Sequence, residues 1–169
     1  GFCLSDDQRR TLVDGDYHVD IDSRFDQGSL TYGELVIPGT SSAEVLLSTY
    51  ICHPSLANNE LSGPVVLTAV AKWLHEQDRR FTYRLVFIPE SIGALLYSSM
   101  NLRELQKHVV AGINLTCIGD DGDYSFLASR EGNSPIDRIG TRVVRDTPQP
   151  VEYSYLDRGS DERTYAAPG

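Results

Sequence analysis

STYICHPSLANNELSG, residues 48–63, joins a strand-like segment to a helix-like one. The run EVLLSTYI, residues 44–51, is apolar and β-branched and predicts a buried strand, while residues 64–74 carry apolar side chains at helical spacing. The stretch is therefore predicted to be a strand-to-helix turn. In an open α/β sheet such turns lie at the carboxyl ends of the strands, where ligands bind. This turn carries three polar candidates, His53, Asn59 and Glu60.

Strands and helices alternate along the rest of the chain. Strand-like segments recur at residues 82–88 and 109–118, and helical segments are predicted at residues 61–75 and 93–106. This alternation predicts an α/β fold with a mostly parallel sheet and helices on both faces. The apolar face of the first long helix is expected to consist of Val65, Val66, Ala69, Val70, Trp73 and Leu74.

Each of the three predicted central strands is followed by a residue that can take part in catalysis. In chain order these residues are His53, Glu90 and Asp120. Because parallel strands direct their carboxyl ends to the same edge of a sheet, we expect the three side chains to share one crevice. Structural roles stay open as well: a loop histidine, a helix-capping glutamate and a turn-forming aspartate.

The first 39 residues are predicted to form a small β-rich subdomain. Residues 16–22 (DYHVDID) alternate between apolar and polar side chains, and residues 30–37 (LTYGELVI) also predict a strand. A turn-rich PGTSS segment follows, so we place a boundary near Thr40, before an α/β core of residues 40–169. We expect this subdomain to pack beside the central sheet without extending it.

Shorter elements are predicted toward both ends of the chain. They are a helix within residues 5–15 capped by Ser5, a strand at 124–128, a helix at 136–144, an edge strand at 151–155 and a loop at 157–163.

The composition limits the classes of partner. The chain has 169 residues, enough for one domain with a hydrophobic core. Its net charge of −9, from 15 Lys+Arg against 24 Asp+Glu, argues against nucleic acid and anionic membranes as partners. An acidic surface also suits a site for cations or free amines, although solubility explains it equally well. The apolar runs are too short to cross a membrane, and the composition does not indicate an oligomeric state.

The three cysteines predict a reducing, cytoplasmic compartment. Cys3, Cys52 and Cys117 cannot all pair within the chain, and the last two lie in apolar segments where buried thiols are common. Cys52 precedes His53, which suggests a thiol nucleophile. Neighbouring residues on a strand point to opposite faces, so we expect the two side chains not to act together.

A hydrolytic zinc site is the chemistry that these residue types suggest. Such a site needs nitrogen and oxygen ligands, an open position for water and a carboxylate that takes the proton of the water. The candidate ligands are His53, Asn59, Glu60 and Asp120, and the candidate base is Glu90.

The turn carries a family resemblance. Residues 52–54 (CHP) and 57–63 (ANNELSG) resemble the metal-binding turn of the zinc-dependent aminopeptidase superfamily, which includes bacterial leucyl aminopeptidase and the glutaminyl cyclases. They are more similar still to bacterial aminopeptidase-like proteins associated with polysaccharide biosynthesis, whose turn usually has the sequence CHPSLANDNLSG. The resemblance implies a zinc-exopeptidase fold and hydrolysis of a small amine-bearing or peptide substrate.

The resemblance also implies roles for single residues. His53 matches the first zinc-ligand histidine, Asn59 takes the place of a metal-bridging aspartate, and Glu90 matches the general base. Residues 160–169 resemble a segment that shapes the substrate pocket, which implies pocket roles for Ser160 and Asp161.

Several positions depart from the family pattern. Ser91 and Thr116 stand where the family has carboxylate ligands, and Asn59 is a neutral amide. We therefore expect at most one divalent metal, with Glu60 able to restore a negative charge. The last ligand histidine of the family would lie beyond Gly169, which predicts that the chain is a fragment with an incomplete site.

Two functions from different classes follow. The first is a metal-dependent exopeptidase or amidohydrolase, favoured by His53, Glu90 and the Leu-Ser-Gly turn. The second is a non-catalytic domain that keeps the peptidase fold for binding or assembly in polysaccharide biosynthesis, favoured by Asn59, Ser91 and Thr116.

Overall fold

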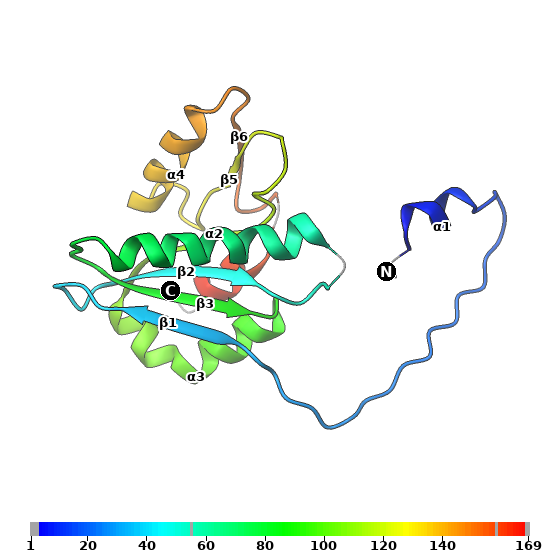
Figure 1. The fold of residues 1–169 in the computed structure, drawn as a ribbon, viewed down its shortest axis with the longest axis horizontal. Coiled ribbons are helices and arrows are strands. Elements are labelled where there is room, and N and C mark those ends of the chain that lie inside the picture. Colours follow the sequence, from blue (N-terminus) through cyan, green and yellow to red (C-terminus); the bar gives the residue numbers. More distant parts are fainter. Residues whose placement is uncertain (1–3, 55, 158, 168–169) are drawn as a thin grey trace.

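The structure is a computed structural model, and it describes residues 4–54, 56–157 and 159–167. The described elements form a mixed α/β fold (Figure 1). The helices are α1 (Asp6–Arg10), α2 (Ala57–His75), α3 (Ile92–His108), α4 (Pro135–Arg145) and α5 (Asp161–Ala166). The strands are β1 (Gly33–Ile37), β2 (Glu44–Tyr50), β3 (Thr82–Ile88), β4 (Val109–Asn114), β5 (Ser125–Leu127) and β6 (Val151–Tyr153).

Four strands form the central sheet, in the order β1-β3-β2-β4. Strands β3, β2 and β4 run parallel, with Leu47 of β2 opposite Leu85 of β3 and Ile113 of β4. Strand β1 is antiparallel to β3. The predicted parallel arrangement therefore holds for three strands, and the sheet as a whole is mixed.

Strand β1 corrects the prediction for residues 30–37. The strand exists, but it pairs with β3 inside the central sheet, where we expected it to pack separately. Ion pairs also hold β1 against the sheet, since Arg84 of β3 pairs with Glu34 of β1 and with Glu44 of β2. The Tyr97 hydroxyl of α3 donates to Glu34 at 2.8 Å. This network fixes β1 to the sheet.

The segment before β1 has little structure of its own. The predicted strand at residues 16–22 is wrong: residues 12–32 contain no helix or strand, and Figure 1 shows them leading away from the sheet. Alternation alone is insufficient because a strand needs a neighbour to satisfy its backbone groups. Helix α1 confirms the predicted short helix, since Ser5 and Gln8 cap it reciprocally. The division of the chain at Thr40 stays a prediction.

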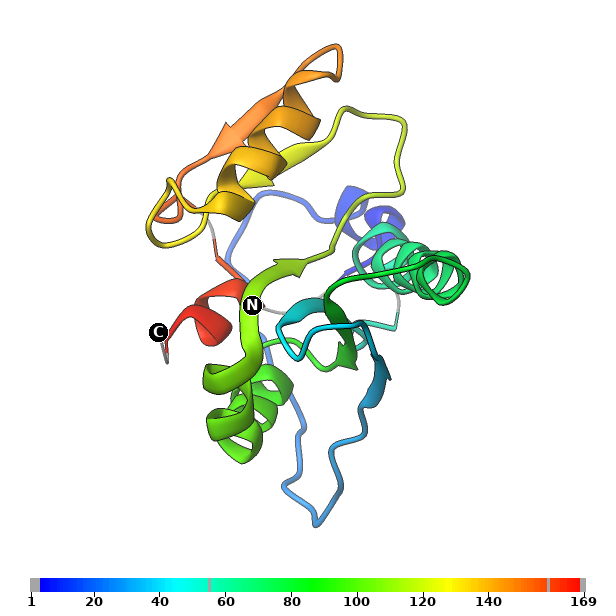
Figure 2. The ribbon, with the colours of Figure 1, turned by 90° about the vertical axis from the view of Figure 1, so that its left-hand side faces the viewer.

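Helices cover both faces of the central sheet, as predicted. Helix α2 lies on one face, and α3 and α5 lie on the other (Figure 2). The core on the α2 side contains Ile37, Leu47, Leu67, Leu74 and Leu85. The core on the α3 side contains Leu46, Val86, Ile88 and Tyr97.

Helix α2 begins at Ala57, four residues before the predicted start at Leu61. Asn58 and Asn59 are residue types that favour caps and turns. In the fold Asn58 instead binds the segment after β4, where its Oδ1 accepts the N–H of Gly119 at 2.9 Å. The early start places Glu60 in the first turn of α2.

The predicted apolar face of α2 is largely wrong. Among its residues Leu74 is buried and Val70 is half-buried, but Val65, Val66, Ala69 and Trp73 are exposed. The buried positions also include Gly63 and Leu67. A Cβ atom on Gly63 would lie 2.1 Å from Thr49 Oγ1 of β2, so the helix packs directly against the sheet at this glycine.

The C-terminal half contains a second, two-stranded parallel sheet formed by β5 and β6. These strands and α4 confirm the predicted short elements, while α5 replaces the predicted loop at 157–163 in part. Strand β4 ends at Asn114, before the predicted end at Ile118. Within the described parts of the chain, no helix is long and apolar enough to span a lipid bilayer.

Candidate metal centre

His53 and Glu90 lie together at the carboxyl ends of neighbouring strands. His53 follows β2, Glu90 follows β3, and the two strands pair along their whole length. His53 Nε2 is 4.0 Å from Glu90 Oε2. The expected proximity of these two side chains is therefore confirmed, while their roles stay predictions.

Glu60 binds the other ring nitrogen of His53. Its Oε1 pairs with His53 Nδ1, and its Oε2 accepts the backbone N–H of Cys52. Burial alone would raise the pKa of Glu60, but the hydrogen bonds from His53 and Cys52 outweigh burial and lower this pKa below its ordinary value. The buried Glu60 side chain is thus an ionised group aimed at the imidazole.

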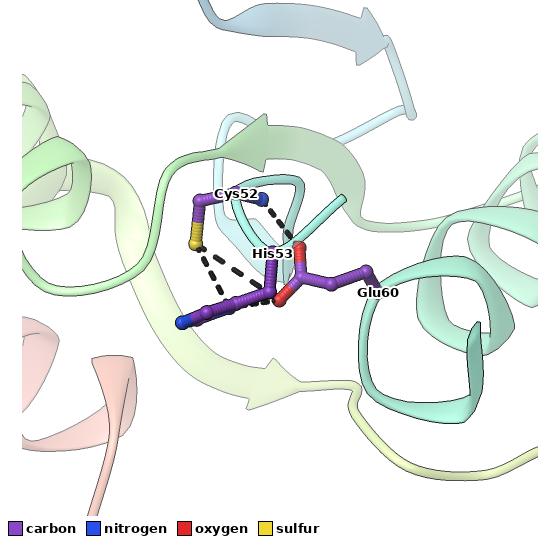
Figure 3. A group of neighbouring side chains, drawn as sticks. All are labelled: Cys52, His53 and Glu60. Carbon is purple, nitrogen blue, oxygen red and sulfur yellow. Dashed lines mark hydrogen bonds and ion pairs between the residues drawn. The ribbon is translucent and has the colours of Figure 1, made fainter. Parts of the chain in front are cut away.

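Cys52 lies on the same side of the chain as His53, contrary to expectation (Figure 3). Its Sγ is 3.3 Å from His53 Nδ1 and 3.9 Å from Glu60 Oε1. Strand β2 ends at Tyr50, so the alternation of a strand no longer governs residues 52 and 53. Burial raises the pKa of the Cys52 thiol, which disfavours a free thiolate nucleophile.

The Glu90 carboxylate is held from the C-terminal end of the described chain. Its Oε1 accepts the Ser160 hydroxyl, and the neighbouring Asp161 accepts the backbone N–H of Ser91 at 2.7 Å. Asp161 is fully buried, and its Oδ2 has no hydrogen-bond partner within the described residues. Burial raises the pKa of Asp161 to about 6. Both predicted pocket residues therefore adjoin the candidate base or its neighbour.

Asp120 is engaged elsewhere. Its Oδ2 accepts the Asn58 amide at 2.7 Å, and its Oδ1 accepts the N–H of Gly122 at 2.8 Å. The side chain is exposed, and within the described residues it does not join the group formed by Cys52, His53 and Glu60. Of the three residues expected to share one crevice, the structure therefore brings together His53 and Glu90.

Asn59 belongs to an uncharged cluster beside β2. Its amide nitrogen lies 3.4 Å from both the Tyr50 hydroxyl and Cys117 Sγ, and Thr116 Oγ1 donates to the Tyr50 hydroxyl. Asn59 Oδ1 is buried and has no hydrogen-bond partner in the described parts of the chain. Cys52 and Cys117 are free thiols, and Cys3 lies outside the described residues, as does Gly169 of the pocket motif.

Comparisons with known proteins assign the chain to a family. Residues 15–169 match the family model described as "Domain of unknown function (DUF4910)". The chain belongs to the DUF4910 family. Two relatives of this DUF4910 chain come from Clostridium acetobutylicum, and both match it along its whole length.

One relative has the name "Putative polysaccharide biosynthesis protein with aminopeptidase-like domain" and is 40% identical over 172 residues. The other is a crystal structure described as a "putative peptidase", with 39% identity and a TM-score of 0.82. The DUF4910 chain spans 39% of the length of the first and 40% of the second. The aminopeptidase-like resemblance thus agrees with the name of one relative and the peptidase description of the other.

The donor atoms of the DUF4910 chain fit one zinc ion. One atom each from Cys52, His53 and Glu60 lies within 4.8 Å of the other two, and zinc accepts sulfur, nitrogen and oxygen ligands. Asn59 and Thr116 lie in an uncharged cluster, so they supply no carboxylate to a further metal ion. Sequence reasoning missed Cys52, although its place directly before His53 at a strand end was a usable signal.

Proposed function

We propose that the chain forms part of a metal-dependent hydrolase of aminopeptidase type, with a single zinc ion held through His53 and Glu60 and with Glu90 as general base. The observation that carries this proposal is the placement of the two carboxylates on opposite nitrogens of one imidazole, Glu60 at Nδ1 and Glu90 facing Nε2 at 4.0 Å. The names of the two relatives support the reaction class.

Each carboxylate has one oxygen held by the protein and one directed at the centre. Glu60 Oε2 is held by the Cys52 N–H, so Oε1 is directed at His53 Nδ1. Glu90 Oε1 is held by Ser160, so Oε2 is directed at His53 Nε2. A bound zinc ion would supply Lewis-acid activation of a water molecule. Glu90 would take the proton of that water and pass it to the leaving amine.

The substrate in this proposal is a small peptide or another molecule with a free amine. Ser160 and Asp161 would line its binding site, because Ser160 contacts Glu90 directly and Asp161 is buried beside it. A negative environment favours an ammonium group over an anion. The proposed setting is the cytoplasm, without nucleic acid or membrane as a partner.

The second candidate is a non-catalytic binding or assembly domain linked to polysaccharide biosynthesis. The uncharged residues Asn59, Ser91 and Thr116 favour it, since they stand where the resembled family has carboxylates. The name of the first relative is equally consistent with this candidate.

Metal content and peptidase activity of the longest natural form of the protein separate the two. We expect one zinc per chain by elemental analysis and hydrolysis of aminoacyl anilides. His53→Ala should lose both, and Glu90→Gln should keep the zinc while lowering kcat by about 100-fold or more. Asp121→Asn, at an exposed aspartate, is the matched control. One zinc with no hydrolysis would favour the binding domain, and a protein without stoichiometric metal would refute the hydrolase.

A further inference from the structure

Resting on the proposed function, we propose that the Cys52 thiolate is the third protein ligand of the zinc ion. The metal centre would then be a Cys-His-Glu site with one open position for water.

The distances around Cys52 suit a tetrahedral ion. Zinc bonds of about 2.3 Å to sulfur and about 2.0 Å to nitrogen or oxygen place neighbouring ligand atoms about 3.5 Å apart. Cys52 Sγ lies 3.3 Å from His53 Nδ1 and 3.9 Å from Glu60 Oε1, on either side of that value. The third pair, Nδ1 and Oε1, is now joined by a hydrogen bond and would separate to admit the ion.

The sulfur is positioned by the same strand end that carries the base. The backbone N–H of Glu90 donates to Cys52 Sγ at 3.1 Å, so the thiol faces the segment that follows β3. A hydrogen bond of this kind favours sulfur in its anionic form. Figure 3 shows Cys52, His53 and Glu60 converging from two segments, the loop after β2 and the first turn of α2.

Charge balance also favours a dication here. The carboxylates that act on the sulfur through space belong to Glu60, Glu90 and Asp161. Adding a thiolate to three carboxylates without a cation would be costly, whereas a zinc ion compensates two of these charges. On binding, the thiol proton leaves to the buffer, and the ring proton at His53 Nδ1 moves to Nε2, so that the neutral imidazole binds the ion through Nδ1.

Cobalt substitution tests this assignment on the full-length protein. A thiolate ligand gives bound Co²⁺ an intense near-ultraviolet charge-transfer band, which nitrogen and oxygen ligands do not give. We expect the band in the wild type and in the Cys117→Ser control, and its loss in Cys52→Ser. We also expect the zinc affinity of Cys52→Ser to fall by more than about 100-fold.

A sulfur shell in the X-ray absorption spectrum of the zinc-loaded wild type gives the same answer without any variant. One bound metal with no charge-transfer band and no sulfur shell would overturn the thiolate ligand while leaving the proposed hydrolase intact. Unchanged zinc affinity in Cys52→Ser would also overturn it. Failure of the wild type to bind either metal would refute both proposals together.

Discussion

The carboxylate of Asp161 accepts the backbone N–H of Ser91 at 2.7 Å, across 70 positions of the chain. Ser91 has a φ of 61°, in the region that non-glycine residues rarely adopt, and it is the residue directly after the candidate base. The buried aspartate therefore stabilises an unusual backbone conformation beside Glu90. Its second oxygen lacks a hydrogen-bond partner within the described residues, so this stabilisation comes with a cost.

Asp161→Asn should stabilise the protein at pH 7.5 and change little at pH 4. The pKa of Asp161 is about 6 in the folded chain and about 4 when unfolded, so ionisation lowers the free energy of unfolding by about 3 kcal/mol above pH 6. That penalty disappears as the pH falls from 6 to 4. Thermal melts at both pH values, with the exposed Asp121→Asn as control, measure the difference. Destabilisation at pH 7.5 would instead indicate that a cation binds the Asp161 carboxylate.

Asp137→Ala should destabilise the unit formed by β5, β6 and α4 by about 2–4 kcal/mol at neutral pH. The Asp137 carboxylate accepts four hydrogen bonds of 2.6–2.7 Å, from the backbone and hydroxyl groups of Ser129 and Ser134. Burial raises its pKa, but these bonds outweigh burial and lower it. The contribution of ionised Asp137 to the free energy of unfolding is therefore complete above about pH 4, and it is lost as the pH falls through the pKa of Asp137 in the folded chain. Urea unfolding at pH 7 and pH 3 checks this, with the exposed Asp146→Ala as control.

Arg84→Met should lower the free energy of unfolding by about 3–5 kcal/mol, because it leaves two carboxylates without their cation. Arg84 donates to Glu44 through Nε at 2.6 Å and Nη2 at 3.0 Å, and it also pairs with Glu34. Hydrogen exchange should accelerate first in β1, which Glu34 ties to the sheet. The control Arg10→Met removes an exposed ion pair with Asp6 and should lower the free energy of unfolding by less than about 1 kcal/mol. Equal losses for both variants would contradict the role given to Arg84.

Gly63→Ala should destabilise the fold although alanine favours helices. Helix propensity alone predicts that alanine raises the free energy of unfolding by about 1 kcal/mol. The added Cβ, however, would lie 2.1 Å from Thr49 Oγ1 and 2.5 Å from the Leu115 carbonyl oxygen. Overpacking against backbone typically costs about 1–3 kcal/mol. Ala69→Gly, at an exposed position of α2, measures the propensity effect alone. A stabilised Gly63→Ala variant would show that α2 can move away from β2.

The predictable part of the fold is the part in which local pattern and tertiary environment agree. Strands β2 and β3 are buried between helices, so their continuous apolar runs located them almost to the residue. The segment at residues 16–22 has a clear alternation but pairs with no strand among the described residues, so the prediction of a strand failed there. The hydrophobic pattern shows that a segment can form a strand, but the strand forms only where a neighbouring strand pairs with it.

The candidate site was predictable where it follows directly from strand order. His53 and Glu90 end two neighbouring parallel strands, and their proximity required nothing more than the topology. The contact between Glu90 and Ser160 joins residues 70 positions apart and depends on the path of the chain around α4. Hydrophobic periodicity in the sequence does not predict that path. The position of the Cys52 sulfur beside His53 likewise depends on β2 ending at Tyr50, and strand boundaries are the least certain part of any prediction from sequence.

Strand β4 is the part of the central sheet at which we expect molecules of this chain to associate. It occupies one border of the central sheet, its sequence VVAGIN contains no charged side chain, and Val110 is 62% exposed. A border strand whose own side chains are uncharged is a template on which a second molecule can extend the sheet. Repulsion from a net charge of −9 keeps molecules apart at low ionic strength, but salt screens it within about 10 Å at 0.1 M. Precipitation of this chain should therefore begin at β4 and increase with added salt, and a lysine in place of Val110 should delay it.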